Sequence, residues 1–349
     1  MVKVAMAIKI LIGGSPCTYW SIAQKNNRET EANGVGWELF KNYLIAREKF
    51  KPDYFLYENN KSAAQSIKDQ ISRELGVDLM YINSALVSAQ NRQRFYAFNW
   101  TVEQPEDRGI LLKDILETGE DLTGNDKSFL YYIIPVRVGD LPNAKGEISG
   151  SQATRIYSVK GKSVNLVANG GGQGAKTGLY AVSVTQKSTD VHEVRDGFIT
   201  IKNKRYPIKL ADGFYTIRKL TPLECERLQT LPDNYTKAVS NTQRYKGLGN
   251  GWTAEVIIHI LNGILKDVPK DEEIIVLSLY DGIGTGRYCF DKMGFTNVRY
   301  HAYEIDKYAI QVAMDNYPDI IQHGDAFAVR EDSWRPPQTQ SDNTIICVK

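Results

Sequence analysis

IIVLSLYDGIGTGRYCFDKMGF, residues 274–295, decides the fold class, because it runs from an apolar strand through glycines into a helical segment. Gly282, Gly284 and Gly286 have a G-x-G-x-G spacing, which differs from the dinucleotide spacing G-x-G-x-x-G. The next predicted strand, VRYHAYEID, ends near Glu304, where an acid can bind ribose hydroxyls. This order indicates a site for an adenosine-containing cofactor; a glycine turn in an ordinary α/β protein is the alternative.

The same alternation of strands and helices occupies the N-terminal third of the chain. LIGGSPCTYWS, residues 11–21, has the pattern of a strand that ends in a glycine turn and presents Cys17 at its tip. A helix is predicted over residues 37–49, and a buried strand is predicted to end at Glu58. After a second helix, two strands around a polar turn are predicted between residues 79 and 100. These elements predict an α/β domain with a mostly parallel, doubly wound sheet.

The middle of the chain has a different character and predicts a separate, mostly β domain. Short β-type runs such as RIYSV and GFITI are separated by Gly, Asn and Lys, and a glycine-rich loop, NGGGQGAKTG, lies among them. Residues 140–250 carry 17 Lys and Arg against 9 Asp and Glu, whereas the whole chain has a net charge of only +2. A basic module on a mildly acidic body is typical of a protein that binds a polyanion. A solvated surface with a chance asymmetry of charge is the alternative.

Composition excludes several classes of protein. The 349 residues are 42% hydrophobic, which is enough to bury a substantial core. No apolar run reaches the roughly 18 residues of a membrane span, and the N-terminal MVKVAMAIKILI has the features of a strand, not of a signal peptide. The 4 cysteines are far apart and form no CxxC motif. This argues against a disulfide framework or a zinc site and favours a reducing cytosol.

Cys17 is the candidate nucleophile. A thiol attacks as its thiolate, so a catalytic cysteine is expected beside cationic groups. Arg92 and Arg94 lie two positions apart in AQNRQRF and share one face of a strand. Glu58 ends another strand, and the carboxyl ends of parallel strands meet at one edge of a sheet. A thiol, an acid and an arginine in one pocket suit attack on an electron-poor ring; the alternative is that Cys17 is a small buried apolar residue.

Seven motifs taken together resemble those of the DNA cytosine-5 methyltransferases: GGSPC, YENN, AQNRQRF, RKLTPLECERLQTLPDNY, GLGNGW, LSLYDGIGTG and YEID. The resemblance spans nearly the whole chain. It implies a Rossmann-like, S-adenosylmethionine-dependent methyltransferase fold with a smaller, irregular, β-rich target-recognition domain. It also implies that Cys17, Glu58, Arg92 and Arg94 are catalytic. The implied reaction is methylation at C5 of a cytosine flipped out of duplex DNA, through a covalent bond between Cys17 and C6.

The resemblance further implies which residues hold the cofactor and the DNA. S-adenosylmethionine is expected to lie against the glycine loop, the ends of the next two strands and the Gly-Asn motif: Tyr280, Asp281, Gly282, Gly284, Thr285, Glu304, Ile305, Asp325, Ala326, Asn250 and Trp252. Double-stranded DNA is expected to contact a second set: Ser15, Gln90, Asn165, Gly171, Gly172, Lys202, Lys204 and Arg205. No metal ion is expected. The loop after Cys17 is expected to swing over the flipped base through Asn33 and Gly36.

The order of the motifs departs from that of most family members. The cofactor loop usually opens the chain and the Pro-Cys loop follows, whereas here the Pro-Cys loop comes first. This implies a circular permutation, with KDVPKDEE, residues 266–273, joining the old ends. The catalytic domain is then expected over residues 1–130 and 218–349, and the target-recognition domain over residues 131–217.

Details of the motifs also depart from the commonest bacterial form. Thr18 stands where Gln usually follows the nucleophile, Asp281 replaces a common Ala, and Trp252 follows the Gly-Asn pair. These three choices resemble the vertebrate de novo branch of the family. Asn60 replaces a Val, and Val-Asn-Leu at residues 164–166 stands where Pro-Thr-Leu is usual, which puts the usual threonine contact to the DNA backbone in doubt.

The resemblance implies a cytoplasmic enzyme of a prokaryotic or phage-infected cell that acts on double-stranded DNA and not at a membrane. A monomer is expected, but the sequence does not determine the oligomeric state. Whether it has a partner restriction endonuclease stays open, as does the target sequence. Two rival hypotheses are the same chemistry on RNA and a catalytically silent DNA-binding relative. The large basic domain favours duplex DNA, because a flipped base needs a domain on the opposite groove. The joint presence of Cys17, Glu58 and Arg94 argues against the silent relative.

Overall fold

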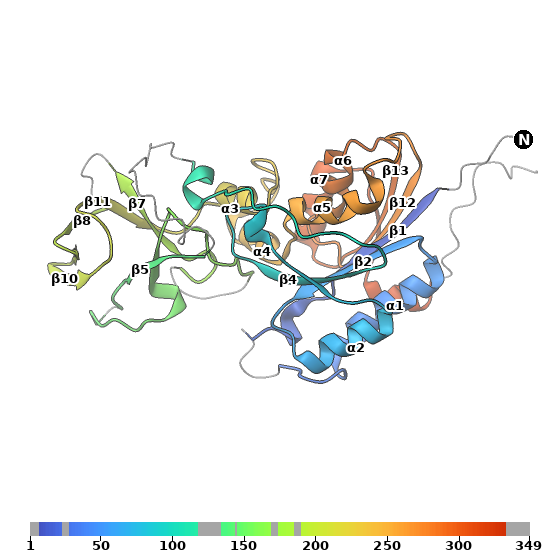
Figure 1. The fold of residues 1–349 in the computed structure, drawn as a ribbon, viewed down its shortest axis with the longest axis horizontal. Helices are drawn as coiled ribbons and strands as arrows, with labels where there is room; N and C mark the ends of the chain where they lie inside the picture. Colours follow the sequence, from blue (N-terminus) through green and yellow to red (C-terminus); the bar gives the residue numbers. More distant parts are fainter. Residues whose placement is uncertain are drawn as a thin grey trace, which may run out of the picture.

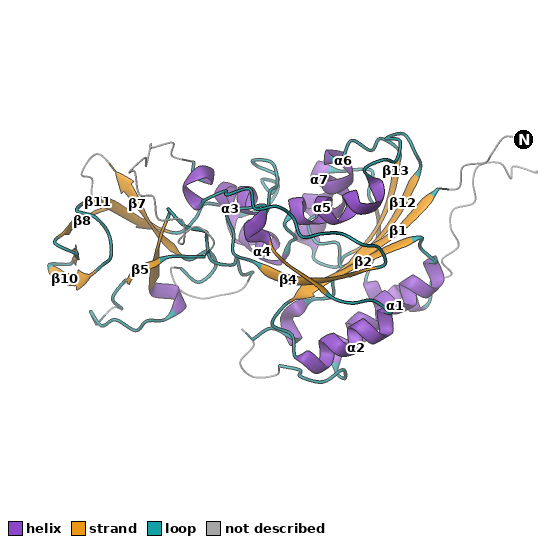
Figure 2. Ribbon diagram, in the orientation of Figure 1, coloured by secondary structure: helices purple, strands orange, loops and turns teal. Residues whose placement is uncertain are grey.

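The computed structural model describes residues 7–22, 28–117, 134–143, 145–168, 174–184 and 190–332. Within them the chain forms two seven-stranded sheets, one covered by helices and one built almost entirely of strands and loops (Figures 1 and 2). Strands of the first sheet come from both ends of the described chain, and strands of the second come from its middle. The expected α/β fold with a smaller β-rich module is confirmed.

The first sheet has the strand order β14-β13-β12-β1-β2-β4-β3. Its strands are β1 (Ile8–Gly13), β2 (Tyr54–Asn60), β3 (Met80–Asn83), β4 (Gln93–Phe98), β12 (Ile274–Leu279), β13 (Val298–Tyr303) and β14 (Ile321–Gly324). Neighbouring strands from β14 to β2 are parallel, and β4 runs antiparallel to both of its neighbours. The N-terminal strand β1 therefore lies in the middle of the sheet, between β12 and β2.

Helices cover both faces of this sheet. Successive side chains of a strand point to opposite faces, so strands with apolar residues on both faces need helices packed on both sides. The helices are α1 (Val35–Phe50), α2 (Gln65–Leu75), α3 (Pro222–Leu228), α4 (Asn241–Asn250), α5 (Ala254–Leu265), α6 (Thr285–Lys292) and α7 (Lys307–Asn316). Leu11 and Leu277 belong to one apolar core with α1 and α2. Ile10 and Val276 belong to a second core with α5, α6 and α7. The doubly wound arrangement expected from the sequence is the one observed (Figure 2).

The second sheet has the order β10-β9-β8-β11-β7-β6-β5. Its strands are β5 (Arg137–Asp140), β6 (Arg155–Ser158), β7 (Leu179–Val184), β8 (Val191–Arg195), β9 (Phe198–Ile201), β10 (Lys204–Pro207) and β11 (Gly213–Arg218). All of its pairs are antiparallel except β6 with β7. A small core that includes Ile156, Val194 and Ile199 holds it together.

The segment around Lys162 fastens the second sheet to the first. Ser163 pairs with Gln90 in an isolated parallel bridge, and its amide donates to the carbonyl of Ala89 at 2.7 Å. The Lys162 ammonium is almost completely buried. It donates to the backbone oxygens of Ala85 at 2.6 Å, Ser88 at 3.1 Å and Ile110 at 2.6 Å. A buried cation satisfied by three carbonyls is a strong local anchor, because those carbonyls have no water to replace it.

Among the described residues, no helix has the length and apolar character needed to cross a bilayer.

Lys162→Met is expected to lower the free energy of unfolding by about 3 kcal/mol, because it leaves buried carbonyl groups without a donor. Urea unfolding followed by tryptophan fluorescence measures the change. Lys160→Met is the matched control, since Lys160 lies exposed in the same loop and a surface substitution changes stability by no more than about 0.5 kcal/mol. Equal stability of the two variants would contradict the anchoring role of Lys162.

Candidate active site

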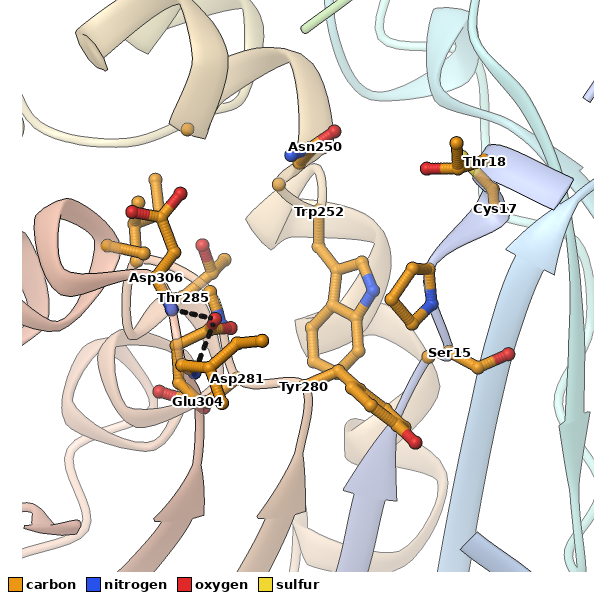
Figure 3. Close-up of a pocket in the computed structure, with 18 of the residues that line it drawn as sticks. Ser15, Cys17, Thr18, Asn250, Trp252, Tyr280, Asp281, Thr285, Glu304 and Asp306 are labelled. Atoms are coloured by element: carbon orange, nitrogen blue, oxygen red, sulfur yellow. Dashed lines mark hydrogen bonds between the residues drawn. The ribbon is translucent and has the colours of Figure 1, made fainter. Parts of the chain in front are cut away.

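A cavity of about 430 Å³ opens at the edge of the first sheet where β1, β2, β12 and β13 end. Its lining comes from the loop after β1, the end of β2, the segment after α4, the glycine loop after β12 and the loops after β13 and β14. The carboxyl ends of parallel strands thus bring together residues that lie hundreds of positions apart in the chain. Figure 3 shows the part of the cavity around the glycine loop.

Cys17 begins a short 3-10 helix, Cys17–Tyr19, directly after β1 and Pro16, and lines the cavity with a free, half-buried thiol. The loop before it is held on β2. The Asn59 amide donates to the backbone oxygen of Ser15 at 2.9 Å, and the hydroxyls of Ser15 and Tyr57 lie 2.6 Å apart. These buried bonds fix the position from which the thiol enters the cavity.

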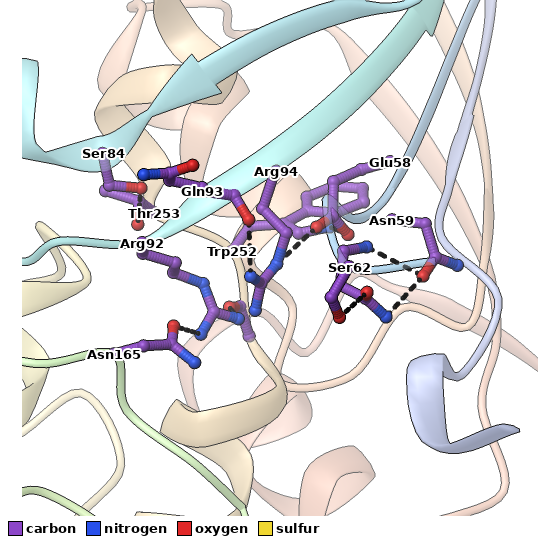
Figure 4. Close-up of polar contacts among 12 residues, drawn as sticks. Glu58, Asn59, Ser62, Ser84, Arg92, Gln93, Arg94, Asn165, Trp252 and Thr253 are labelled. Carbon is purple, nitrogen blue, oxygen red and sulfur yellow. Dashed lines mark hydrogen bonds and ion pairs between the residues drawn. The ribbon is translucent and has the colours of Figure 1, made fainter. Parts of the chain in front are cut away.

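Glu58, at the end of β2, receives a donor on each carboxylate oxygen (Figure 4). Arg94 Nε lies 3.0 Å from Oε1, and the indole Nε1 of Trp252 donates to Oε2 at 2.9 Å. The Glu58 and Arg94 side chains are only 11% and 12% exposed. Cys17, Glu58 and Arg94 all line the same cavity, so the structure brings together the three residues that the sequence predicted to cooperate.

Arg92 also lines the cavity, but its guanidinium is used to join segments of the protein. One terminal nitrogen donates to Asn165 Oδ1 at 3.0 Å, and the other donates to the backbone oxygens of Gly249 at 3.3 Å and Gly251 at 2.8 Å. Burial, together with the nearby charge of Arg94, lowers the pKa of Arg92 to about 9. Arg92 therefore stays positive at neutral pH and clamps the second sheet to the segment that carries Trp252.

The glycine loop and Glu304 form the other half of the cavity. Tyr280, Gly282 and Gly284 all have positive φ angles, of 60°, 65° and 77°. Glu304 Oε2 accepts the amide of Gly282 at 2.8 Å, and Oε1 accepts the amides of Ile305 and Asp306 at 2.8 Å each. The carboxylate thereby fixes the turn, and its remaining lone pairs are available to a ligand.

Asp281 and Thr285 have buried polar atoms without a partner among the described residues. Asp281 Oδ1 accepts the hydroxyls of Ser278 at 2.7 Å and Tyr300 at 2.6 Å, whereas Oδ2 accepts none. Burial raises the pKa of Asp281 to about 6. An unpartnered acidic oxygen beside a glycine loop suits a ligand that carries a donor or a positive charge.

The other residues predicted to hold the cofactor surround this half of the cavity. Asn250 lines it from the exposed end of α4, and Asp325 lines it as the cap of a 3-10 helix, Ala326–Arg330, where its Oδ1 accepts the amide of Phe327 at 2.9 Å. The Ile305 side chain is 71% exposed, whereas Ala326 is buried. Of the 11 predicted cofactor residues, 10 line the same cavity; the exception is Gly284, which lies in the glycine loop beside it.

The predicted DNA contacts fall into three groups. Gln90 is fully buried, and its side chain bonds to the backbone of Leu166 and Leu228. Ser15 and Asn165 likewise have protein partners in this conformation. The cationic residues lie exposed at the β9–β10 turn and on β10: Lys202, Lys204 and Arg205. Gly171 and Gly172 lie outside the described residues.

The residues expected to let the Cys17 loop move lie at the start of α1. Gly36 lies in its first turn, and its amide is held at 3.1 Å by both carboxylate oxygens of Glu29. Gly34 precedes α1 with a φ of 87°, a conformation that favours glycine. The movement through Asn33 and Gly36 stays a prediction. Sequence reasoning missed Asn59, because its position next to Glu58 on a strand does not show that its amide reaches back to the nucleophile loop.

Comparison with known proteins agrees with this geometry. The family model described as C-5 cytosine-specific DNA methylase matches residues 3–266. The chain is 26% identical over 283 residues to the type II methyltransferase M.HhaI of Haemophilus parahaemolyticus, covering 74% of this chain and 75% of that protein. It is 24% identical over 369 residues to the orphan methyltransferase M.SPRI of Bacillus phage SPR, with 73% and 82% covered. It is 28% identical over 262 residues to the type II methyltransferase M.HpaII of Haemophilus parainfluenzae, with 69% and 67% covered.

The fold and the cavity define a methyltransferase built on a Rossmann-like sheet. Since the family model matches well over half of its residues, the chain belongs to the C-5 cytosine-specific DNA methylases. The enzyme is a DNA cytosine-5 methyltransferase, and its substrate is DNA.

Asp281→Asn is expected to remove a pH dependence of stability. The pKa of Asp281 is raised from 3.8 to about 6 by folding, so this group stabilises the fold most at acid pH. That contribution is lost as the pH rises through about 6. The unfolding free energy of the wild type relative to the variant should thus fall by about 3 kcal/mol between roughly pH 3 and pH 7. Urea titrations across this range measure it, with Asp315→Asn, on the exposed side of α7, as the control. A constant difference would show that Asp281 ionises normally.

Proposed function

We propose that this protein transfers a methyl group from S-adenosylmethionine to C5 of a cytosine flipped out of duplex DNA. The observation that carries the proposal is the single cavity in which Cys17, Glu58 and Arg94 face the glycine loop and Glu304. A nucleophile, an acid and a cation suit the pyrimidine ring, and the glycine loop with its acid suits an adenosine-containing donor. The methyl donor and the base that accepts the methyl group can thus both bind at the same edge of the sheet.

The residues present fit S-adenosylmethionine. A Cβ added at Gly282 would meet no atom within 4 Å, so the turn leaves space for a ligand against its backbone. Glu304 has lone pairs for the ribose hydroxyls, and Asp325 is expected to accept from the adenine amino group. Tyr280 is expected to contact the adenine. The unpartnered oxygen of Asp281 suits the positive charge of the methionine portion. When bound, the cofactor supplies an electrophilic methyl group on a sulfonium.

The chain's own residues then perform the following steps. The Cys17 thiolate forms a bond to C6 of the cytosine, which breaks the aromaticity of the ring and makes C5 nucleophilic. Glu58 binds N3 and supplies the proton that prevents negative charge from accumulating there. Arg94 supports Glu58 and the base carbonyl. After C5 has gained the methyl group it loses its proton to solvent, and the bond between Cys17 and C6 breaks to restore the aromatic ring.

The second sheet is proposed to read the DNA. It carries the exposed cations of β10 at one end and joins the catalytic sheet through Lys162 and Arg92 at the other. Lysine and arginine contacts to phosphate give affinity without sequence preference, whereas loop side chains can read base edges in the major groove. The glycine-rich loop is also proposed to approach the DNA. Its residues 170–173 lie outside the described residues.

The order of the motifs supports a circular permutation of the catalytic domain. β12 pairs along its whole length with β1, although 260 residues separate the two strands. The match to the family model ends at residue 266, where the linker 266–273 begins. We propose that residues 1–130 and 218–349 form one catalytic domain and residues 131–217 the target-recognition domain. A monomer suffices for this arrangement. A partner restriction endonuclease remains open, because the relatives include both type II and orphan enzymes.

Cys17→Ser is expected to abolish methylation, because a serine hydroxyl is a far weaker nucleophile than a thiolate at neutral pH. The protein is expressed in a methylation-free host, and genomic 5-methylcytosine is sequenced, which also reveals the target site. A duplex with 5-fluorocytosine at that site should trap the wild type covalently, because fluorine cannot leave as a proton.

Cys225→Ser serves as the control, since Cys225 is a free, buried thiol on α3, outside the cavity. Methylation by Cys17→Ser at the wild-type rate would refute the assigned nucleophile. A wild-type protein that neither methylates the genome nor forms the adduct would support the alternative hypothesis of a catalytically silent DNA-binding relative.

Alanine at Lys202, Lys204 and Arg205 together is expected to flatten the salt dependence of DNA binding. Each lost phosphate contact reduces the slope of log K against log salt by about 0.9. Fluorescence anisotropy at several salt concentrations measures the slope. Lys266→Ala is the control, because Lys266 lies exposed before β12, at the opposite edge of the sheet from the cavity. An unchanged slope in the triple variant would place the DNA elsewhere.

A further inference from the structure

Trp252 joins the two halves of the cavity through its indole N–H. Nε1 donates to Glu58 Oε2 at 2.9 Å, while Arg94 holds Oε1 at 3.0 Å from another side (Figure 4). With one donor on each oxygen, the carboxylate plane of Glu58 is fixed. The Arg94 contact adds a positive charge to the site, whereas the Trp252 contact adds none. The indole can therefore orient the acid without changing the charge of the cavity.

The backbone that carries Trp252 is itself held in place. The backbone oxygen of Gly251 accepts from Arg92 at 2.8 Å and from the Gln229 amide at 3.2 Å. The amide of Gly251 donates to Gly247 at 2.8 Å. In Figure 3 the indole ring lies between the loop that contains Ser15 and the side of the cavity formed by Asp281 and Glu304. The ring thus faces the cofactor half while its N–H reaches the catalytic acid.

We propose that Trp252 is a positioning residue for Glu58, in addition to forming part of the cofactor wall. The indole N–H holds the carboxyl group of Glu58 in the orientation in which Glu58 gives its proton to N3 of the base. This inference rests on the proposed function, because it assigns to Trp252 a part in the cytosine chemistry. The contact joins residues 194 positions apart in the chain and involves a tryptophan that departs from the commonest form of the family.

The two roles of Trp252 reside on different atoms, so one substitution separates them. Trp252→Phe keeps an aromatic face toward the cofactor and removes the N–H. If the N–H orients Glu58, the rate of methyl transfer in a single turnover should fall about 10- to 100-fold, the effect of losing a hydrogen bond to a charged group. The KM for DNA and the affinity for S-adenosylhomocysteine, measured by calorimetry without DNA, should stay at wild-type values.

A double-mutant cycle with Glu58→Gln tests whether the indole acts through the acid. In the Glu58→Gln background, Trp252→Phe should cost much less than in the wild type, because the charge that the N–H stabilises has gone. The readout is the rate of covalent trapping on the 5-fluorocytosine duplex. Equal losses in both backgrounds would overturn the proposal, as would a loss confined to the affinity for S-adenosylhomocysteine.

Trp100→Phe is the matched control. The Trp100 indole donates to the backbone oxygen of Ile260 at 2.9 Å, so this variant loses a comparable bond away from the cavity. It should transfer methyl groups at the wild-type rate, and its melting temperature shows what the loss of an indole bond costs the fold. A wild-type protein without methylation or trapping would refute the proposed function itself, whereas an active wild type with a fully active Trp252→Phe variant would refute only the role of Trp252.

Discussion

The parallel pairing of β1 with β12 on one side and β2 on the other is the constraint on which the site depends. Gly13 pairs with both Leu279 and Tyr57, so β1 and β12 end at one level and Glu58 is the next residue along β2. A Cβ at Gly13 would lie 2.8 Å from the Leu279 oxygen, and one at Gly14 would lie 2.7 Å from the Glu58 oxygen. Only glycine therefore fits at these two positions, where the chain leaves β1, passes close to Glu58 and turns toward Cys17. A slip of one residue in β1 would also exchange its two apolar faces and separate the thiol from the acid.

The sequence predicts those elements whose own residues specify them. The apolar runs of β1, β2 and β12 and the periodicity of α1 are local signals, and they identify the doubly wound sheet. α4 has no such signal, because NTQRYKGLGN contains two glycines and only a narrow apolar face. It forms where Leu248 is fully buried in the core shared with α3. The strands of the second sheet are short and bounded by turns, so their order follows from tertiary pairing that no local pattern encodes.

The sequence could predict which site residues lie together where this follows from strand ends, but not where it follows from contacts between distant segments. Cys17 and Glu304 follow parallel strands, and Glu58 lies near the end of a third, so their meeting at one edge could be foreseen. The contacts of Arg92 with Asn165 and of Trp252 with Glu58 could not, because each joins segments that approach one another only after both sheets have formed. The residue type determines which interactions a side chain can make, but the fold determines which partner it contacts.

The cavity separates charge along its length. The half beside the glycine loop carries the carboxylates of Asp281, Glu304 and Asp325, and the half beside the nucleophile loop carries Arg92 and Arg94 around Glu58. Inside a protein, where the effective dielectric constant is lower, such charges interact more strongly than they would in water. Under the proposed function, the acidic half would attract a sulfonium donor, and the basic half would favour a thiolate and the phosphates of DNA.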